Sequence, residues 1–245
     1  MLSVEQSNSR IRLRDQLAIG RRELQAKFQS SPSHVLGSNE LLPMAVGSHE
    51  VIYCLRAGWA CQHLGLASGR KVIVDIYLPG DVIGLDAAIR ARRSEDILTL
   101  TSVTVETIHK EDALIGLIAS QCTALYMTWL LAQRQQRTDR LLAAFSCLDA
   151  RGRLATILLD FYSRLRRRKL IAISEYNLPL TQTQIGNFLG LTAVHVNRML
   201  RSLGDDGIVR VQKQCVTILD LERLRNLTQH EAITERAGTR AEAAD

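Results

Sequence analysis

The stretch LTQTQIGNFLGLTAVHVNRMLRSL, residues 180–203, predicts two short helices joined by a tight corner. Thr181 is suited to cap the first helix, and Gln184 three residues later completes a capping-box pattern. The apolar residues of this helix fall on one face: Ile185, Phe188 and Leu189. Gly190 follows directly and supplies the backbone freedom that a sharp reversal of the chain needs.

Thr192 is placed to cap the second helix, which has an inward apolar stripe of Val196, Met199, Leu200 and Leu203. Small and polar residues remain near its outer face, mainly towards its start: Ala193, Val194, His195, Asn197, Arg198 and Arg201. A short helix, a Gly-containing turn and a second helix of this kind are typical of a helix-turn-helix. The second helix is therefore expected to enter the major groove of duplex DNA.

The composition indicates a folded protein with one large or two modest domains. The chain has 245 residues, 46% of them hydrophobic, and only four prolines. No apolar run approaches the roughly 18 residues of a membrane span, and residues 1–14 are too polar for a signal sequence. We therefore expect a cytoplasmic protein without membrane association. The five cysteines are scattered and never at CxxC spacing, so neither a disulfide framework nor a metal or iron–sulfur cluster is predicted.

The placement of charge is more informative than the net charge of +6. Residues 150–225 contain thirteen Lys or Arg and six Asp or Glu, which gives this third of the chain a net charge of +7. A basic segment attached to a nearly neutral body is the electrostatic signature of a module that binds a polyanion. Aromatic residues make up only 4% of the chain, which disfavours base-stacking surfaces for single strands and favours duplex as the ligand.

The N-terminal half predicts a short helical segment followed by an antiparallel β structure. Residues 1–33 are compatible with one or two helices and a flexible end, and SSPSH at 30–34 is expected to break them. Residues 34–110 contain short β-branched runs, punctuated by Gly, Asp or Pro about every ten residues, as in a sandwich or barrel. The runs begin with LLPMAV at 41–46. Gly69 and the segment Pro79-Gly80-Asp81 are expected to form hairpin turns.

Residues 111–147 predict one long helix, because nothing between positions 112 and 145 interrupts it. One seam has a spacing of 3.5 residues: Leu117, Gln121, Ala124, Thr128, Leu131, Gln135, Thr138, Leu142 and Phe145. Such a seam favours parallel coiled-coil pairing of two chains, with the polar residues setting the register. A second seam of Cys122, Leu125, Trp129 and Ala132 could pack on the β structure instead. A lone buried helix is the alternative to dimerisation.

Residues 148–228 predict a compact DNA-binding domain around the helix-turn-helix. An amphipathic helix is expected from 151 to 164 and ends in the basic run RLRRRK at 164–169, which is either solvated or in contact with phosphates or a polymerase. Residues 207–219 predict a two-strand wing, and DLERLRNL at 220–227 a last helix. Residues 229–245 are expected to be a flexible tail.

Several segments in this order resemble the Crp/Fnr family of bacterial transcription regulators. They are LPGDVIGL at 78–85, LDARGRLA at 148–155, the helix-turn-helix at 180–203 and the wing after it. The resemblance covers about residues 35–225 and implies an α+β fold. Its parts are an N-terminal antiparallel β-roll of the double-stranded β-helix or jelly-roll type, a long dimerisation helix and a C-terminal winged helix-turn-helix. GWAC at 58–61 and VHVNR at 194–198 are similar to a branch common among alpha-proteobacterial regulators.

The resemblance does not extend to the family's cofactor and effector sites. Members that bind cyclic AMP carry a Glu near the position of Leu85 and an Arg-Ser/Thr pair near Ser94, where this chain has Glu95 and Asp96. Arg92 and Arg93 are the available substitutes. The oxygen-sensing branch needs an N-terminal cysteine cluster, but residues 1–53 contain no Cys, and haem would need an axial ligand such as His63 or His109. No cofactor, no metal and no cyclic nucleotide are therefore expected, and oxidation of Cys61 or Cys122 is an unsupported alternative.

The resemblance implies that a homodimer reads a palindromic operator in double-stranded DNA, with RNA polymerase as a further partner. Base edges would be read by Val194, Asn197 and Arg198. Phosphates would be bound by Thr181, Gln182, Thr183, Thr192 and His195, with Ala193 and Arg201 on the same surface. The alternatives are a regulator whose roll binds a small effector, a module whose winged helix binds protein, and an enzyme. The sequence contains no His/Glu metal cluster, activated Ser or Cys motif, or Gly-rich phosphate loop, so no enzyme is predicted.

Overall fold

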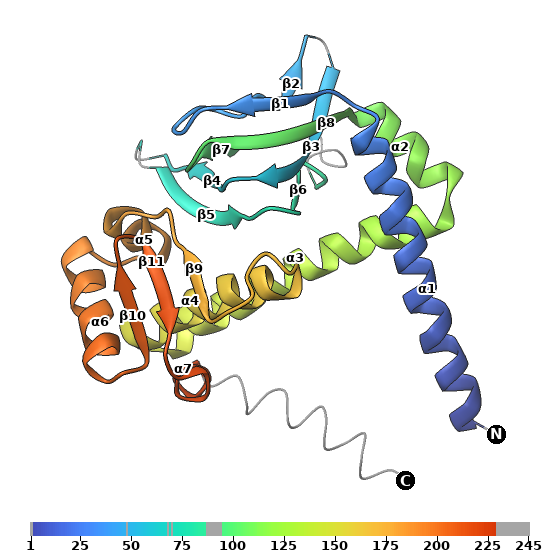
Figure 1. The fold of residues 1–245 in the computed structure, drawn as a ribbon. Coiled ribbons are helices and arrows are strands. Elements are labelled where there is room, and N and C mark those ends of the chain that lie inside the picture. The colour runs from blue at the N-terminus through green and yellow to red at the C-terminus, as the bar shows by residue number, and fades with distance from the viewer. Residues whose placement is uncertain (1, 48, 68, 70, 87–94, 229–245) are drawn as a thin grey trace. The chain divides into compact units, whose positions relative to one another are not determined.

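The computed structural model of the chain describes residues 2–47, 49–67, 69, 71–86 and 95–228. It divides into two compact units, Met1–Arg137 and Thr138–Asp245, which are described separately below. The first unit is a curled antiparallel β structure with helices, and the second is mainly helical with a small sheet (Figure 1). This arrangement confirms the predicted α+β class with an antiparallel N-terminal β structure.

The β-roll of the first unit consists of two sheets. Its strands are β1 Ser33–Leu36, β2 Ala45–Val46, β3 His49–Ala57, β4 Ala60–Gly65, β5 Lys71–Tyr77, β6 Val82–Ile83, β7 Glu95–Thr99 and β8 Val103–His109. One sheet has the order β1-β8-β3-β2, with β6 also paired to β3, and the other has the order β5-β4-β7. All these pairings are antiparallel. Side chains from both sheets meet in one apolar core that includes Val51, Leu55, Tyr77, Ile83 and Val105.

The local predictions for the strands were partly wrong. The predicted break at SSPSH is confirmed, because α1 ends at Gln29, but residues 33–36 then form strand β1, paired to β8. The run 41–46 is a strand only at Ala45–Val46, with Leu41 making a single bridge to Leu98. Strand β1 is decided by its partner β8, about 70 residues further along the chain, and not by local composition.

One of the two expected hairpin turns joins different sheets. Gly69 lies at φ +79° between the paired strands β4 and β5, as expected for a hairpin. The turn at Gly80 is present, but the strand after it, β6, pairs with β3 and not with β5. Asp81 fixes this turn because its carboxylate accepts a hydrogen bond from the Leu78 N–H at 2.7 Å, and its carbonyl accepts one from the Leu55 N–H at 2.9 Å.

The N-terminal segment forms one helix, α1 Leu2–Gln29, that packs on the roll. Leu24 and Phe28 are almost fully buried in a second apolar cluster with Ile52, Ile108 and Met127. Because Phe28 is among the largest fully buried side chains of the described residues, α1 completes the core of this unit.

The predicted long helix is interrupted, which corrects the expectation of one continuous helix over 111–147. Helix α2, Lys110–Ala119, ends at Ser120, whose backbone is extended (φ −137°, ψ 117°), and helix α3, Gln121–Cys147, begins directly after it. The Ser120 hydroxyl accepts a hydrogen bond from the Thr123 N–H at 3.2 Å and so caps α3. The Ser120 and Thr123 hydroxyls both donate to Glu23 of α1, at 2.5 and 2.6 Å, and these bonds lower the pKa of Glu23. A partner 97 residues away thus stabilises the break.

The face of α3 that packs on the roll differs from both predicted seams. Thr123 and Met127 are buried, and Leu130 and Leu131 pack against the same cluster. In the second seam, Trp129 is 40% exposed and Ala132 is exposed, so that seam does not cover the roll as a whole. The positions of the 3.5-residue seam that stay exposed are Gln121, Thr128, Gln135, Thr138 and Leu142. The Leu117 side chain lies outside the described residues.

A polar network ties α3 to the roll at Arg134. Its guanidinium lies 2.7 Å from a carboxylate oxygen of Asp86 and 3.1 Å from one of Asp75, and it donates to the Gln62 amide oxygen at 2.5 Å. The same guanidinium stacks over the Tyr77 ring, 5.7 Å from its centroid. This half-buried cation is satisfied by two carboxylates of the roll, so the middle of α3 is held by directional contacts as well as apolar packing.

No single helix among the described residues has both the length and the apolar composition needed to cross a membrane. Within the described part of the chain, one pair of segments meets those limits when taken jointly, Lys110–Gly116 and Gln121–Cys147, and a bend of 117° separates them. Ala113 and Met127 of this pair are buried in the cluster beneath α1, which accounts for part of its apolar composition.

The second unit is a three-stranded sheet surrounded by helices. Its elements are α4 Ala150–Arg167, β9 Glu175–Asn177, α5 Gln182–Leu189, α6 Ala193–Asp205, β10 Val209–Gln212, β11 Cys215–Ile218 and α7 Leu221–Leu227. The predicted wing is present as β10 and β11, and β9, which was not predicted, adds a third strand beside β11. The expected tail at 229–245 lies outside the described residues.

The basic run at 164–169 is not uniformly solvated. Arg164 is 3% exposed and lies 3.3 Å from the Asp160 carboxylate, one helical turn earlier. Arg166 is exposed but donates to the Tyr162 hydroxyl at 2.6 Å and lies over that ring. The prediction of a solvated run is therefore wrong for Arg164, whose side chain is part of the packing of α4.

Candidate nucleic-acid interface

The helix-turn-helix begins with the capping box that the sequence predicts. The Thr181 hydroxyl accepts a hydrogen bond from the Gln184 N–H at 3.1 Å, and the Gln184 side-chain oxygen accepts one from the Thr181 N–H at 2.9 Å. These reciprocal bonds satisfy two backbone donors at the start of α5. Thr181, Gln182 and Thr183 are exposed, so their side chains and the helix N-terminus face solvent together.

The corner between α5 and α6 depends on two glycines. Gly190 has a left-handed backbone (φ 68°, ψ 31°), and its N–H and that of Leu191 both donate to the Gly186 carbonyl. Gly186 lies on the inner side of the corner, where an added Cβ would come within 2.5 Å of the Leu191 carbonyl oxygen. No heavy atom lies within 4 Å of a Cβ built at Gly190. The sequence predicted the role of Gly190 but not that of Gly186, whose constraint is a close approach between backbones.

Gly186→Ala should therefore destabilise the protein more than Gly190→Ala. The first substitution forces backbone atoms of the corner apart, and overpacking of this kind costs about 1–3 kcal/mol and occasionally more. The second adds only the strain of a left-handed alanine, about 1–2 kcal/mol. Urea denaturation of the two variants gives the two free energies of unfolding. A larger loss for Gly190→Ala would contradict this account of the corner.

Helix α6 is anchored by its apolar face and leaves its opposite face free. Thr192 accepts a hydrogen bond from the His195 N–H at 3.2 Å and caps the helix as predicted. Val196 and Leu203 are fully buried, and Met199 and Leu200 are partly buried. The inward stripe is thus the predicted one, and the residues between its members project away from the unit.

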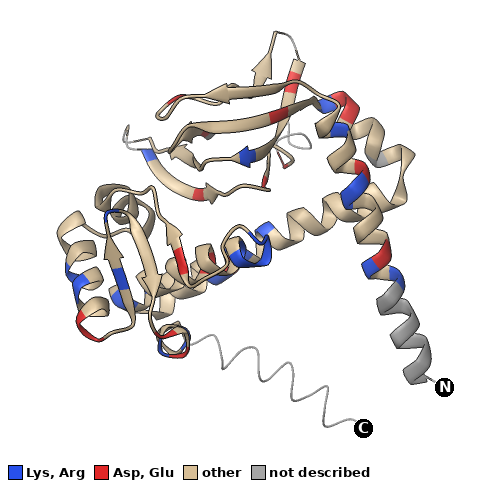
Figure 2. Ribbon diagram, in the orientation of Figure 1, with Lys and Arg blue, Asp and Glu red and all other residues tan. Residues whose placement is uncertain are grey.

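The outer face of α6 is exposed and carries unpaired positive charge. Val194 is 78% exposed, and His195, Arg198 and Arg201 are also exposed, while Ala193 and Asn197 are half-buried. No described carboxylate forms an ion pair with Arg198 or Arg201. Figure 2 shows these cations on α6 and a further one on β10. A free guanidinium on a protruding helix is available for a bidentate acceptor.

Other cations of this unit are engaged within it. Arg151 pairs with Asp206 at the end of α6, and Arg223 donates to the Asp206 carbonyl at 2.8 Å. These contacts fix the C-terminal end of α6 and partly neutralise the acidic residues there. The uncompensated positive charge of α6 consequently lies on its outer face before that end.

The tip of the wing is a tight turn that exposes a lysine. Lys213 and Gln214 both have positive φ, 47° and 66°, between the paired residues Gln212 and Cys215. Two consecutive left-handed residues are the geometry of a type I′ hairpin turn. Lys213 and Arg210 of β10 are exposed. The sequence located this wing but did not identify these two side chains as candidate phosphate contacts.

The end of α3 is joined to the helix-turn-helix. The ring of Phe145 meets that of Phe188 edge-on, with 6.4 Å between centroids and an interplanar angle of 86°. Phe145 was predicted to continue the dimerisation seam, but within this chain it packs on α5 instead. The last turn of α3 and α5 therefore share an apolar contact.

Leu85 and Cys61, which were considered for effector binding and for redox signalling, are both buried in the roll. Leu85 is buried in the cluster beneath α1, and Asp86 after it is paired with Arg134. Ser94, Arg92 and Arg93 lie outside the described residues, as does the Glu95 side chain. Cys61 is fully buried, and burial raises the pKa of its thiol to about 12. Such a thiol is almost entirely protonated at neutral pH and poorly reactive, which argues against oxidation of Cys61 as a signal.

Known proteins with similar sequences or folds are transcription regulators. Residues 152–227 match the family model of the Crp-like helix-turn-helix domain. The transcriptional regulatory protein btr of Bordetella pertussis is 27% identical over 75% of this chain and 75% of its own length. An anaerobic regulatory protein of Haemophilus influenzae is 29% identical over 78% of this chain and 74% of its own.

A solved structure shows the same fold over most of the chain. FixK2 from Bradyrhizobium japonicum has a TM-score of 0.69 and 22% identity, over 80% of this chain and 96% of that one. The family model begins within α4 and ends with α7, so it covers the capping box, the corner, α6 and the wing. Together with the relatives, these observations support a transcription regulator of the Crp/Fnr family, with a Crp-like helix-turn-helix domain at residues 152–227.

Proposed function

We propose that the chain acts as a homodimer on a roughly palindromic operator and places α6 of each copy in the major groove. The observation that carries this proposal is the free, exposed guanidinium of Arg198 on a helix whose opposite face is anchored by the buried Val196 and Leu203. Two such helices related by a twofold axis would meet half-sites about one helical turn apart.

Sequence would be read by three residues near the start of α6. Arg198 donates both arms of its fork to the O6 and N7 of a guanine. Val194, 78% exposed, packs on a thymine methyl, because a valine cannot accept the cytosine amino proton that a glutamate would take. Asn197 is half-buried and reaches the base between them or the adjacent phosphate.

Phosphates on either side would hold the helix in register. Thr181, Gln182 and Thr183 lie at the exposed N-terminus of α5, where backbone N–H groups and the helix dipole favour an anion. The other contacts come from the outer face of α6 and the wing: Thr192, Ala193 through its backbone, His195, Arg201, Arg210 and Lys213. These contacts strengthen binding to all sequences and make it dependent on salt.

The dimer contact is proposed along α3. Five seam positions are exposed along α3, a helix about 40 Å long: Gln121, Thr128, Gln135, Thr138 and Leu142. They are separated by 7, 7, 3 and 4 residues, as the 3.5-residue repeat requires. Leu142 is 64% exposed, which is unfavourable for a large apolar side chain that stays in water. A second copy of α3 paired along the 3.5-residue seam would cover it. A dimer also accounts for the Gln and Thr residues of the seam, because polar residues at such positions set the register of parallel helix pairs.

Selection of bound duplexes from a random pool tests the proposal. Enrichment of a palindrome with two half-sites about 10 base pairs apart, centre to centre, is the expected result. Retention of duplex without any enriched motif would refute sequence-specific reading. A failure to retain duplex would favour the alternative of a protein-binding winged helix.

Two further parts of the proposal rest on the family resemblance. The regulator would act in the cytoplasm, where the chromosome is, and would contact RNA polymerase when bound at a promoter. Control by a small molecule is the less favoured alternative, since the buried Leu85 stands near the position where members that bind cyclic AMP carry a Glu.

A further inference from the structure

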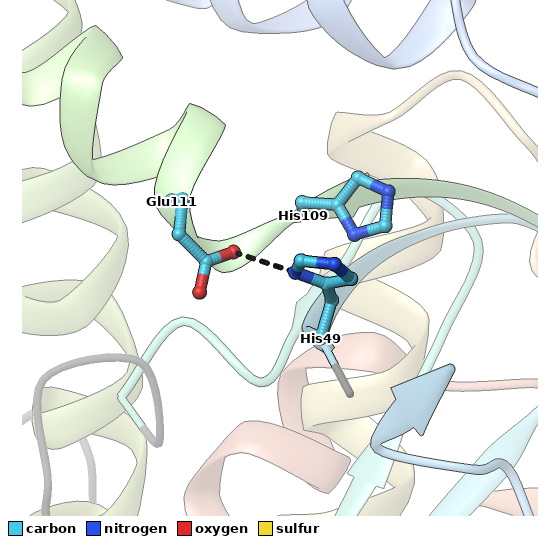
Figure 3. A group of neighbouring side chains, drawn as sticks. All are labelled: His49, His109 and Glu111. Atoms are coloured by element: carbon cyan, nitrogen blue, oxygen red, sulfur yellow. Dashed lines mark ion pairs between the residues drawn. The ribbon is translucent and has the colours of Figure 1, made fainter. Parts of the chain in front are cut away.

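Three potential metal ligands meet at one edge of the roll, far from α6 in sequence. They are His49, His109 and Glu111, and one nitrogen or oxygen atom of each lies within 4.8 Å of the others (Figure 3). The imidazole rings of His49 and His109 meet at an interplanar angle of 66°, with 5.0 Å between centroids. All three side chains are exposed, so an ion can reach them directly from solvent.

The backbone brings these residues together through three secondary-structure elements. His49 is the first residue of β3, and His109 is the last residue of β8. In the antiparallel register His109 lies opposite Val51, so His49 is its diagonal neighbour on the same strand pair. Helix α2 begins at Lys110, and Glu111 in its first turn turns its carboxylate back towards His49.

A direct ion pair does not account fully for this arrangement. The Nδ1 of His49 and a carboxylate oxygen of Glu111 are 4.0 Å apart, which is too far for a hydrogen bond. Metal–nitrogen and metal–oxygen bonds of about 2.0–2.2 Å place two ligands of one tetrahedral ion roughly 3.3–3.5 Å apart. Both side chains are exposed, so small rotations can move their tips by a fraction of an ångström. Such a movement would bring the His49 nitrogen and the Glu111 oxygen to that separation.

Neighbouring charge does not oppose a cation at this position. The adjacent Lys110 is paired with Glu50, 2.7 Å from nitrogen to oxygen, so its charge is compensated locally. His49 and His109 bind a metal when neutral, and Glu111 contributes the negative charge. The three ligands would leave a fourth position for water.

We propose that His49, His109 and Glu111 form a binding site for a divalent transition-metal ion, with Zn²⁺ as the preferred physiological candidate. Two imidazoles and one carboxylate suit borderline ions such as Zn²⁺, Co²⁺ and Ni²⁺, whereas Mg²⁺ and Ca²⁺ prefer oxygen ligands alone. The bound ion would clamp the ends of β3 and β8 to the start of α2. This inference is independent of the proposed DNA contacts, because it involves none of their residues.

Titration of the full chain with Zn²⁺ by calorimetry, and with Co²⁺ by visible absorption, tests the site. One equivalent of each ion should bind per chain, with the Co²⁺ spectrum of nitrogen and oxygen ligands and no thiolate charge-transfer band. Loss of an outer-shell partner already weakens metal binding by about 10–100-fold, so His49→Ala and His109→Ala should each weaken it by at least that much. Glu111→Gln should act in the same direction.

His34→Ala is the matched control, because His34 is an exposed histidine on β1 of the same unit. It should leave affinity unchanged, and circular dichroism should show that all four variants are folded. Stoichiometric binding that survives the His49→Ala/His109→Ala double substitution would overturn the proposal. So would a thiolate band, which would place the ion on a cysteine such as the exposed Cys147. Absence of any binding to the unmodified chain would refute it outright.

Discussion

Arg198→Ala should abolish the preference for one base pair in each half-site of the operator. A bidentate contact to guanine contributes about 1–3 kcal/mol of discrimination, and a dimer makes it twice. The affinity for the selected operator should therefore fall by about 30-fold or more, at 1.4 kcal/mol per tenfold change. Because the side chain is exposed and unpaired, the free energy of unfolding should hardly change. Fluorescence anisotropy with the selected operator, and with its variants at each base pair, gives both quantities.

Arg225→Ala is the control for the loss of one positive charge in the same unit. Arg225 is exposed on α7, outside the proposed interface. Its substitution should leave the order of preference among operators intact. If Arg198→Ala instead weakens binding equally to every duplex and lowers the salt dependence, Arg198 contacts phosphate, and the assigned register of α6 is wrong.

Leu142→Glu should convert the dimer into monomers. Leu142 is 64% exposed in the single chain, so a carboxylate there is hydrated and harmless to the folded monomer. In the proposed pair it would be buried opposite its symmetry mate, and an uncompensated buried charge costs about 3–5 kcal/mol. The dissociation constant of the dimer should increase more than about 100-fold, as measured by sedimentation equilibrium.

Arg140→Glu tests the direction of the proposed seam. Arg140 lies on the same helix, two residues before Leu142, and is exposed away from the 3.5-residue seam. It introduces a larger change of charge, yet it should leave the dimer intact. Dissociation by Arg140→Glu, or a stable dimer of the Leu142→Glu variant, would show that the two chains associate through another surface.

The sequence predicted well those features that depend on short separations. The capping box of Thr181 and Gln184, the left-handed Gly190 and the cap at Thr192 involve spacings of three residues or a single backbone conformation. The inward stripe of α6 follows from helical periodicity alone. Most of the candidate interface could therefore be derived before any coordinates, apart from Gly186 and the exposed cations of the wing.

Features that depend on distant partners were missed for a common physical reason. The break at Ser120 is stabilised by Glu23, and strand β9 exists because β11 offers it a free edge. The local composition of these two segments does not indicate which distant residues they contact. The same holds for His49 and His109, which are 60 positions apart and become neighbours only through the pairing of β3 with β8. Local propensity is a weak guide wherever tertiary contacts decide the outcome.

The burial of Leu24 and Phe28 has a practical consequence for work with shortened versions of the protein. A version that starts at the first strand would leave Ile52, Ile108 and Met127 without the cover that α1 provides. Several large apolar side chains would then face water together, and such a patch promotes self-association. Poor solubility of such a truncated form would therefore be explained by the loss of α1 from the apolar core. Helix α1 should be kept in any biochemical preparation of the protein.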